Sequence, residues 1–177
     1  VAPKSDPELD FYQWQKQPRK ISQNPTKSDC LSCGILFYRS HYLAGNTLPI
    51  DYLCQSIVAK DMRSVPIFIS SLRNIELQQQ LLALLQEQNI KVLLNTTSFS
   101  LDKIGESSQL KFWQELNIPV LQVILSSSTK EQWSSSLQGL MPRDVAMNIA
   151  LPEVDGRIIT RAISFKSVQT WNEKLET

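Results

Sequence analysis

Gly34-Ile35-Leu36-Phe37-Tyr38 is an uninterrupted apolar run, and the polar residues Arg39-Ser40-His41 follow it directly. Apolar runs of this length are typical of strands that are buried on both faces of a parallel sheet. Further runs rich in apolar residues occur later in the chain, at residues 65–69, 90–94, 119–125 and 157–165. The sequence therefore predicts about five buried strands in one mainly parallel sheet.

Segments in which apolar residues recur at helical spacing separate these runs. After Asn74, which can cap a helix, leucines at positions 77, 81, 84 and 85 share one helical face. Helices are expected in the same way at residues 50–58, 110–116, after a capping box at 128–131, and at 141–150 with Pro152 beyond the end. Because alternating strands and helices form right-handed βαβ units, the predicted fold is α/β. We expect a flavodoxin-like or Rossmann-like three-layer sandwich with a central, mainly parallel sheet of about five strands.

The two ends of the chain differ from its middle. Residues 1–29 are polar, contain four prolines and show no periodicity, which is typical of an irregular arm or linker, although Phe11 and Trp14 can dock it on a surface. Residues 30–166 are expected to form the α/β domain, and residues 167–177 the start of a next segment or a tail. Since the chain begins without Met, we expect it to be a piece of a longer protein.

Composition narrows the functional classes. With 177 residues, 42% hydrophobic and 20% charged, the chain fits one ordinary globular domain. Its net charge of +1 gives no electrostatic reason to bind nucleic acid or membrane lipid. The sequence contains neither an apolar run of about 20 residues nor a signal peptide, so we expect no membrane span and a cytoplasmic location. Three cysteines do not form a disulfide framework, which agrees with a reducing compartment.

Open α/β sheets bind ligands beyond the carboxyl ends of their strands. The segments expected at these ends are polar or small, and they comprise residues 39–47, 70–73, 95–100 and 126–128. We expect one crevice to collect them.

Arg39 and His41 follow the first predicted strand. His41 is the only His of the chain, and a neutral imidazole can accept a proton or ligate a metal, although a His on a loop is also commonly a plain surface residue. The guanidinium of Arg39 suits a substrate carboxylate, or is a solvated charge. Asn46 and Thr47 precede the next helix, where free backbone N–H groups favour an anion; either residue can also be a simple helix cap.

Glu153 and Asp155 form a pair of carboxylates on either side of Val154. If the backbone is extended here, the two side chains share one side and can take up a proton or bind a cation. Alternatively, they belong to a solvated turn that ends at Asp155-Gly156.

Cys30 and Cys33 have CxxC spacing. A zinc site needs two more ligands, and of the remaining candidates Cys54 is expected on a buried helical face. A redox motif would follow a strand rather than precede one, so inert cysteines are the simpler interpretation. The chain has neither a P-loop nor a dinucleotide-binding fingerprint.

Five segments occur in order within residues 33–166, and they are residues 34–41, 45–47, 119–122, 139–147 and 151–157. Together they resemble the CobN-type large subunit of cobaltochelatase and, more distantly, the large subunit of magnesium chelatase. Members of this family are several times longer, so the chain resembles one piece of such a subunit.

The resemblance implies a domain of the tetrapyrrole-binding large subunit of an ATP-dependent cobaltochelatase. This cytoplasmic ligase forms nitrogen–metal bonds: it inserts Co²⁺ into hydrogenobyrinic acid a,c-diamide, a corrinoid, during cobalamin biosynthesis. The implied partners are the rest of the large subunit and AAA+ subunits that hydrolyse ATP, and this division of labour agrees with the lack of a P-loop. The chain alone is expected to be inactive.

Metal insertion replaces two ring N–H protons by the ion, and therefore needs a base and oxygen or nitrogen ligands. Among the residues that match the family, His41, Glu153 and Asp155 have suitable side chains, so we expect them to be catalytic, with His41 and Glu153 also binding the metal. Arginines can meet the carboxylate arms of a corrinoid. The expected substrate-binding residues are Arg39, Asn46, Thr47 and Arg157.

Two alternative interpretations stay open. The chain can be a scaffold or docking domain of a chelatase large subunit, cobalt or magnesium, without touching the substrate. It can also be a flavodoxin-like nucleotide-binding module.

Overall fold

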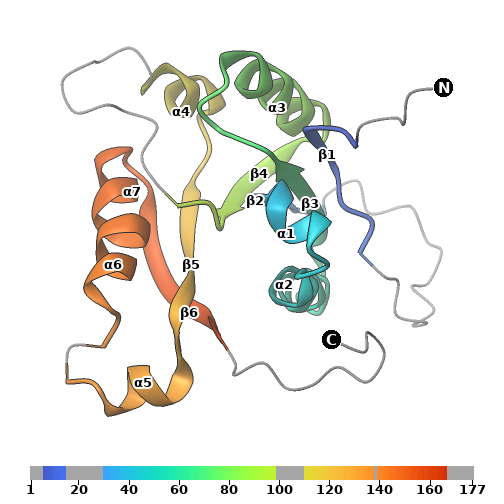
Figure 1. Ribbon diagram of the computed structural model, residues 1–177. Coiled ribbons are helices and arrows are strands. Elements are labelled where there is room, and N and C mark those ends of the chain that lie inside the picture. The colour runs from blue at the N-terminus through green and yellow to red at the C-terminus, as the bar shows by residue number, and fades with distance from the viewer. Residues whose placement is uncertain (1–5, 15–29, 99–109, 138, 167–177) are drawn as a thin grey trace, which may run out of the picture.

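The computed structural model describes residues 6–14, 30–98, 110–137 and 139–166. Within this part of the chain the strands form a six-stranded sheet in the order β1-β3-β2-β4-β5-β6 (Figure 1). Strands β2 to β6 are parallel to their neighbours, and β1 at the edge is antiparallel to β3. The strands are β1 (Leu9–Phe11), β2 (Ser32–Tyr38), β3 (Arg63–Ile69), β4 (Ile90–Asn95), β5 (Val120–Thr129) and β6 (Ile158–Lys166).

Helices flank this sheet on both faces. They are α1 (Arg39–Leu43), α2 (Leu48–Val58), α3 (Ile75–Glu87), α4 (Leu110–Leu116), α5 (Lys130–Ser135), α6 (Pro142–Val145), the π-helical turn η1 (Ala146–Ala150) and α7 (Leu151–Val154).

Two apolar cores result from the alternation of side chains along β2 and β3. Leu36 and Ile67 face the leucines of α3 and the aromatic residues of α4. Ile35 and Phe37 face the opposite way, toward Ile50, Cys54 and Ile57 of α2. These two cores and the sheet between them make three layers, which confirms the α/β sandwich predicted from the sequence.

Helix starts follow the local signals, with one shift. The side-chain oxygen of Asn74 accepts hydrogen bonds from the backbone N–H groups of Glu76 (2.9 Å) and Leu77 (3.3 Å), as expected for the cap of α3. At α5 the capping box joins Thr129 and Gln132, one residue later than the predicted start at residue 128. Because β5 continues to Thr129, the strand decides where this helix begins.

The amino-terminal segment is partly regular. An irregular arm was expected over residues 1–29, yet β1 forms three register pairs with β3, from Leu9 opposite Ile69 to Phe11 opposite Ile67. Trp14 packs against the core on the α2 side, as a docked arm requires. The remainder of the predicted arm outside residues 6–14 and the predicted tail at 167–177 lie outside the described residues.

The helix expected to end before Pro152 continues through it. Helix α6, the π-helical turn η1 and α7 follow one another without a break over residues 142–154. Pro152 cannot donate a backbone hydrogen bond and crowds the preceding turn, and the wider π turn directly before α7 accommodates such a residue. Glu153 is therefore helical and Asp155-Gly156 forms a turn, so the condition of an extended backbone at the two carboxylates is not met.

Candidate functional site

The sheet has one topological switch point, between β2 and β4. From β2 the chain continues to β3 on one side, and β4, β5 and β6 follow on the other. Ligands of open α/β sheets bind at such points, beyond the carboxyl ends of the strands. Here α1 follows β2, and residues 96–98 follow β4. We call this region the switch-point site.

A hydrogen bond crosses the switch point. The Tyr38 hydroxyl, at the end of β2, donates to the backbone oxygen of Ser98 at 2.9 Å. The Thr96 hydroxyl donates to the backbone oxygen of Leu36 at 3.0 Å. These two contacts hold the segment after β4 against the end of β2 and form the floor of the site.

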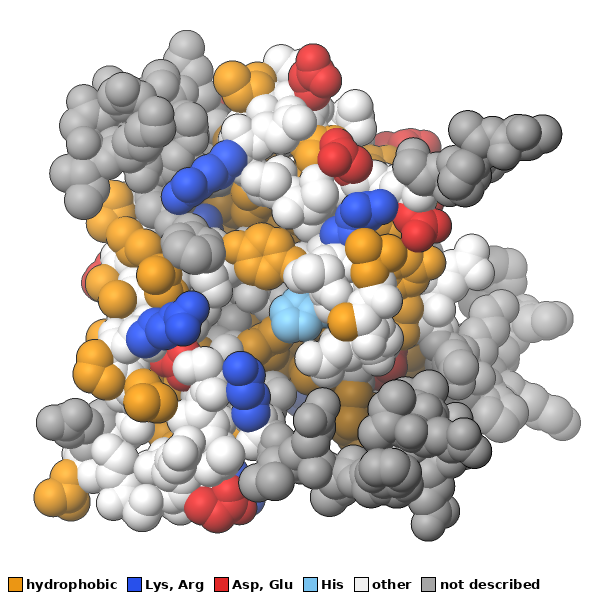
Figure 2. Space-filling model, in the orientation of Figure 1, with side chains coloured by type: hydrophobic (Ala, Val, Ile, Leu, Met, Phe, Trp, Pro, Cys, Tyr) orange, Lys and Arg blue, Asp and Glu red, His pale blue; other side chains and the backbone are white. Residues whose placement is uncertain are grey.

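His41 lies on α1, directly beyond this floor, and is half-buried. Burial lowers the pKa of the imidazole below its ordinary value of 6.5, so His41 is neutral at pH 7. Within the described residues its side chain makes no hydrogen bond or ion pair. Figure 2 shows this face of the molecule, with the chain's one His in pale blue among hydrophobic and basic side chains. A neutral, unengaged imidazole nitrogen can accept a proton or bind a metal ion.

Arg39 and Thr47 attach the amino-terminal segment to the site. One guanidinium nitrogen of Arg39, Nη2, donates to the backbone oxygen of Asp6 at 2.7 Å, while its Nε is buried without a partner among the described residues. The Thr47 hydroxyl accepts from the Tyr12 hydroxyl at 2.9 Å. Asn46 is exposed and leaves its side chain available to solvent.

Asp155 and Arg157 face each other inside the protein. Their side chains are each 1% exposed, and Arg157 Nη2 donates to Asp155 Oδ2 at 2.6 Å. The guanidinium lies over the ring of Trp113, 4.7 Å from its centroid, and Nη1 donates to Gln122 Oε1 at 3.0 Å. The structure therefore brings these two predicted residues together as a buried pair rather than on the surface.

Asn95 and Gln122 extend this pair into a buried polar network. Asn95 Nδ2 donates to Gln122 Oε1 at 2.8 Å, and Gln122 Nε2 donates to the backbone oxygen of Thr97 at 3.0 Å. The Thr97 hydroxyl returns to Asn95 Oδ1 at 2.8 Å. The network fixes the segment after β4. Sequence reasoning missed it, although an amide side chain inside the apolar run 119–125 was a visible signal.

Asn148 links the π-helical turn to the switch-point site. It is buried, and its side-chain oxygen accepts a hydrogen bond from the Ser98 hydroxyl at 2.8 Å. Single π turns inside α-helices are frequent at functional sites. No pattern in the sequence predicted this contact, because residues 98 and 148 meet only in the folded chain.

Asp144 holds α6 against the end of β5. Its carboxylate accepts hydrogen bonds from the Ser126 hydroxyl (2.7 Å), the Ser127 N–H (2.8 Å) and the Ser127 hydroxyl (2.7 Å). Burial works to raise the pKa of Asp144, but the hydrogen bonds from Ser127 and Ser126 outweigh it and hold the pKa below its ordinary value. Ser126 and Ser127 are thus engaged by Asp144, and Ser128 bonds to Ser126, so this segment is tied to α6 instead of lining an open crevice.

Glu153 stands apart from the other predicted residues. It is exposed in the first turn of α7, and within the described residues no hydrogen bond or ion pair joins it to His41 or Asp155. The described part of the chain also holds no group of three or more His, Cys, Asp or Glu side chains that could bind a metal ion together. The Glu153 side chain is therefore free to contact a ligand from outside.

The cysteines are reduced. Cys30 is exposed, whereas burial raises the pKa of Cys33 to about 11 and that of Cys54 to about 12, so both buried thiols stay protonated and unreactive at pH 7. None of the described helices is long and apolar enough to cross a membrane.

Comparisons with known proteins agree on one family. Residues 2–177 match the CobN/Magnesium Chelatase family. The chain is 43% identical over 143 residues to the aerobic cobaltochelatase subunit CobN of Sinorhizobium sp. This match covers 81% of the chain and 11% of that protein. It is 29% identical over 168 residues to a magnesium-chelatase subunit of Rhodobacter capsulatus, covering 88% of the chain and 14% of that protein.

A solved structure is similar over almost the whole chain. The catalytic subunit of cobaltochelatase from Mycobacterium tuberculosis matches with a TM-score of 0.75 and 28% sequence identity. The match covers 94% of this chain and 14% of that subunit. The chain therefore spans 11 to 14% of the length of the relatives it matches.

Proposed function

The chain belongs to the CobN/magnesium chelatase family, and we propose that it forms one domain of the large, tetrapyrrole-binding subunit of an ATP-dependent cobaltochelatase. The whole subunit inserts Co²⁺ into hydrogenobyrinic acid a,c-diamide in the cytoplasm, in the biosynthesis of cobalamin. Partner AAA+ subunits hydrolyse the ATP. One observation carries the choice of cobalt: the identity is 43% to a cobaltochelatase subunit but 29% to a magnesium-chelatase subunit.

Insertion exchanges ring N–H protons for a metal ion. A corrin binds its metal as a monoanion, so, unlike a porphyrin with its two exchangeable protons, the corrinoid gives one ring N–H proton to a base as its four nitrogens bind Co²⁺. His41 is suited to the role of base because its imidazole is neutral at pH 7 and has no partner among the described residues. The same nitrogen can ligate Co²⁺ while the ion loses its water ligands.

In this proposal Glu153 supplies a second metal ligand and a further acceptor for the ring proton. Its carboxylate is exposed and makes no hydrogen bond within the described residues, so binding a substrate or an ion breaks no existing contact. Arg39 and Asn46 lie at the same edge of the sheet as His41, where the arginine can pair with a carboxylate arm of the corrinoid.

Asp155 and Arg157 are positioning residues in this proposal and do not contact the substrate. Because their side chains are buried against each other, we propose that they hold residues 96–98 and the start of β6 in place beneath the site. Thr47 has a similar task, since its hydroxyl accepts a hydrogen bond from Tyr12.

The decisive experiment uses the full-length large subunit with its ATPase partners. Cobalt insertion into hydrogenobyrinic acid a,c-diamide is measured beside magnesium insertion into a protoporphyrin, with ATP present and absent. We expect ATP-dependent insertion of cobalt only. Magnesium insertion into the porphyrin at a comparable rate would assign the chain to the magnesium branch of the family.

A second candidate is a scaffold or docking domain of the same subunit. Several large apolar side chains on α2 and β6 are exposed, among them Tyr52 and Ile163, and exposed apolar surface is a mark of docking. Titration of the full subunit with the tetrapyrrole separates the two roles. Substitution of His41 and Arg39 weakens binding or insertion if this domain contacts the ring, and leaves both unchanged if it does not.

A further inference from the structure

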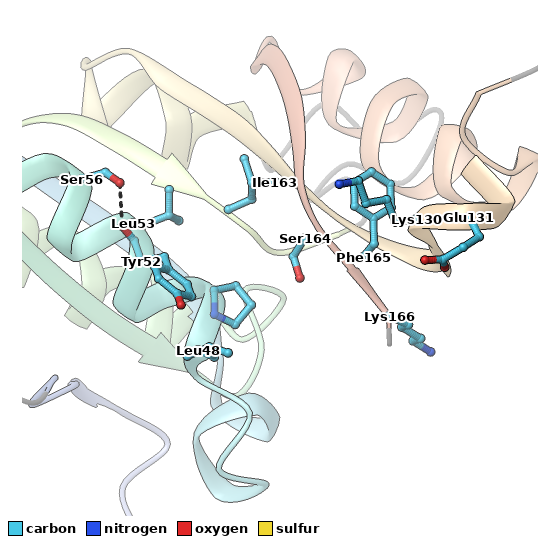
Figure 3. A pocket seen from close by; sticks show the side chains of 11 residues that line it. Leu48, Tyr52, Leu53, Ser56, Lys130, Glu131, Ile163, Ser164, Phe165 and Lys166 are labelled. Atoms are coloured by element: carbon cyan, nitrogen blue, oxygen red, sulfur yellow. Dashed lines mark hydrogen bonds between the residues drawn. The ribbon is translucent and has the colours of Figure 1, made fainter. Parts of the chain in front are cut away.

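The surface between α2 and β6 is an open apolar groove. Its volume is about 660 Å³, and its walls include Leu48 and Tyr52 from α2 and Ile163 and Phe165 from β6. Figure 3 shows side chains of the two elements on opposite sides of this space, with Lys130 and Glu131 of α5 at one end. An adjoining hollow of about 570 Å³ shares Leu53 and Ile163 and continues over Leu94 and Val123. We call the two together the α2–β6 groove.

The groove exists because β5 and β6 extend past the rest of the sheet. β5 pairs with β4 only over Val120–Gln122, and beyond this point the described residues pair β5 with β6 alone. Helix α2 packs on β2 and β3, so it stands beside the projecting ribbon instead of covering it (Figure 1). Large apolar side chains remain exposed as a result: Leu48 is 63% exposed, Tyr52 60% and Ile163 43%.

β6 is also the last strand in the order of the sheet. A long edge strand with exposed apolar side chains offers unpaired backbone groups to any extended chain, and native proteins avoid this by covering the edge. In β6 both Ile158 (53% exposed) and Ile163 face solvent, and the strand is nine residues long. Another part of the complete protein packed here would protect this edge.

The charges around the groove are mostly positive. Lys130, Arg161 and Lys166 lie on its walls beside a single acidic residue, Glu131. None of these three cations forms an ion pair within the described part of the chain. A surface that fits the groove is therefore apolar at its centre and acidic at its margin.

We propose that the α2–β6 groove is an interface with another segment of the same large-subunit polypeptide, an apolar segment flanked by acidic side chains. The inference rests on the proposed function only in placing the chain within a large subunit. The aligned region is 11% of the CobN relative from Sinorhizobium, so most of the polypeptide of such a subunit lies outside it. β6 ends at Lys166, which lies on the wall of the groove.

Thiol labelling in the full-length subunit tests the proposal. Ile163→Cys places a thiol in the groove, and Ile75→Cys is the matched control, because Ile75 is 62% exposed and begins α3 on the other face of the sheet. Native Cys30 is an exposed internal reference. Labelling by a charged maleimide is quantified at each position by peptide mass spectrometry. We expect position 163 to react at least tenfold more slowly than position 75.

Equal reaction at positions 163 and 75 would show an open groove and overturn the proposal. Protection of position 163 only after hydrogenobyrinic acid a,c-diamide is added would make the groove a substrate surface. Protection only after the ATPase subunits are added would assign it to another chain. Both of these outcomes also overturn the proposal. The labelling pattern does not depend on chelatase activity, so failure of the proposed cobalt reaction and failure of this inference are distinguishable.

Carbodiimide cross-linking tests the acidic margin. This reagent joins amines to carboxylates in direct contact, so Lys130 and Lys166 are expected to couple to acidic residues of the same polypeptide outside residues 1–177. Lys91 on β4 is an exposed lysine away from the groove and gives the background. A mixture of isotopically light and heavy subunits separates contacts within one chain from contacts between two. Cross-links between light and heavy chains alone would contradict the proposal.

Discussion

Asp155 and Arg157 are two positions apart in the chain, yet their side chains meet inside the protein at 2.6 Å. A buried ion pair gains little stability over apolar residues, but removal of one partner leaves an uncompensated charge in the interior. The pair contacts both the Trp113 ring and the Gln122 side chain, so its loss would disturb the floor of the switch-point site.

Asp155→Asn is therefore expected to destabilise the 177-residue chain by about 3 kcal/mol or more. Denaturant unfolding followed by tryptophan fluorescence measures the change, and Trp113 beneath Arg157 reports locally. Asp61→Asn is the control, because Asp61 is exposed and has a positive φ that Asn tolerates well. A loss no larger than that of the control would show that the pair is not structural.

His41 and Glu153 should behave in the opposite way. His41→Ala and Glu153→Gln are expected to lower cobalt insertion by the full-length subunit about 100-fold or more, because each removes a proton acceptor. Stability should change by only about 0.5 kcal/mol, since neither side chain makes a hydrogen bond within the described residues. Glu76→Gln, an exposed Glu in the first turn of α3, is the control. Insertion near the wild-type rate would remove the catalytic assignment.

The lowered pKa of His41 predicts a pH dependence of stability. The folded state binds the proton more weakly than the unfolded state, so His41 contributes stability above pH 6.5 that is lost as the pH falls toward its folded pKa. Wild type should therefore lose more stability between pH 7 and pH 5 than His41→Gln does. Denaturant titrations at the two pH values measure this difference, and equal losses would contradict the lowered pKa.

At the scale of the element, a single carboxylate attaches the start of the run from α6 through η1 to α7. Asp144 receives three hydrogen bonds from Ser126 and Ser127, and these are the contacts that attach α6 to the end of β5. The next turns carry Asn148 and Glu153, so the attachment also places residues of the candidate site.

Asp144→Asn is expected to cost about 2 kcal/mol, because the amide keeps one acceptor but turns an N–H₂ group toward donors. Hydrogen exchange should show faster opening of residues 142–154, with β2 and β3 unchanged. Uniform acceleration over the whole sheet would instead mean that Asp144 supports the global fold.

The lowered pKa of Asp144 predicts a pH dependence of stability. The stability that the ionised carboxylate contributes is present above pH 3.8 and is lost as the pH falls through the folded pKa.

At the scale of the whole molecule, the domain has the architecture of a ligand-binding α/β fold without a phosphate cradle in its sequence. We expect the 177-residue chain to show no ATP hydrolysis, since it contains no P-loop. A phosphate-release assay on the purified chain, with the AAA+ partners as the positive control, measures this. Turnover that a point substitution in this chain abolishes would contradict the assignment of ATP hydrolysis to partner subunits.

Local patterns were sufficient to predict the five parallel strands of the sheet, β2 to β6. The apolar run at Gly34–Tyr38 and the leucine face after Asn74 predicted β2 and α3, because burial on a strand and on a helical face imposes different spacings. Strand β1 escaped prediction, since its pairing with β3 depends on a partner more than 50 positions away. Pro152 predicts a helix end, but the helix continues through it, because the π-helical turn before α7 makes room for the proline ring.

The sequence by itself determined the family, the three layers and that polar segments follow β2, β3 and β4, whereas residues 126–128, expected beyond a strand, lie within β5. Only the tertiary structure decided what each polar residue there does. Asp155 faces Arg157, Asn148 meets Ser98, and Asp144 engages Ser126 and Ser127. These partners lie on different elements, and a polar side chain is either buried with a partner or open to a ligand according to which elements pack beside it. Spacing along the chain carries no such information.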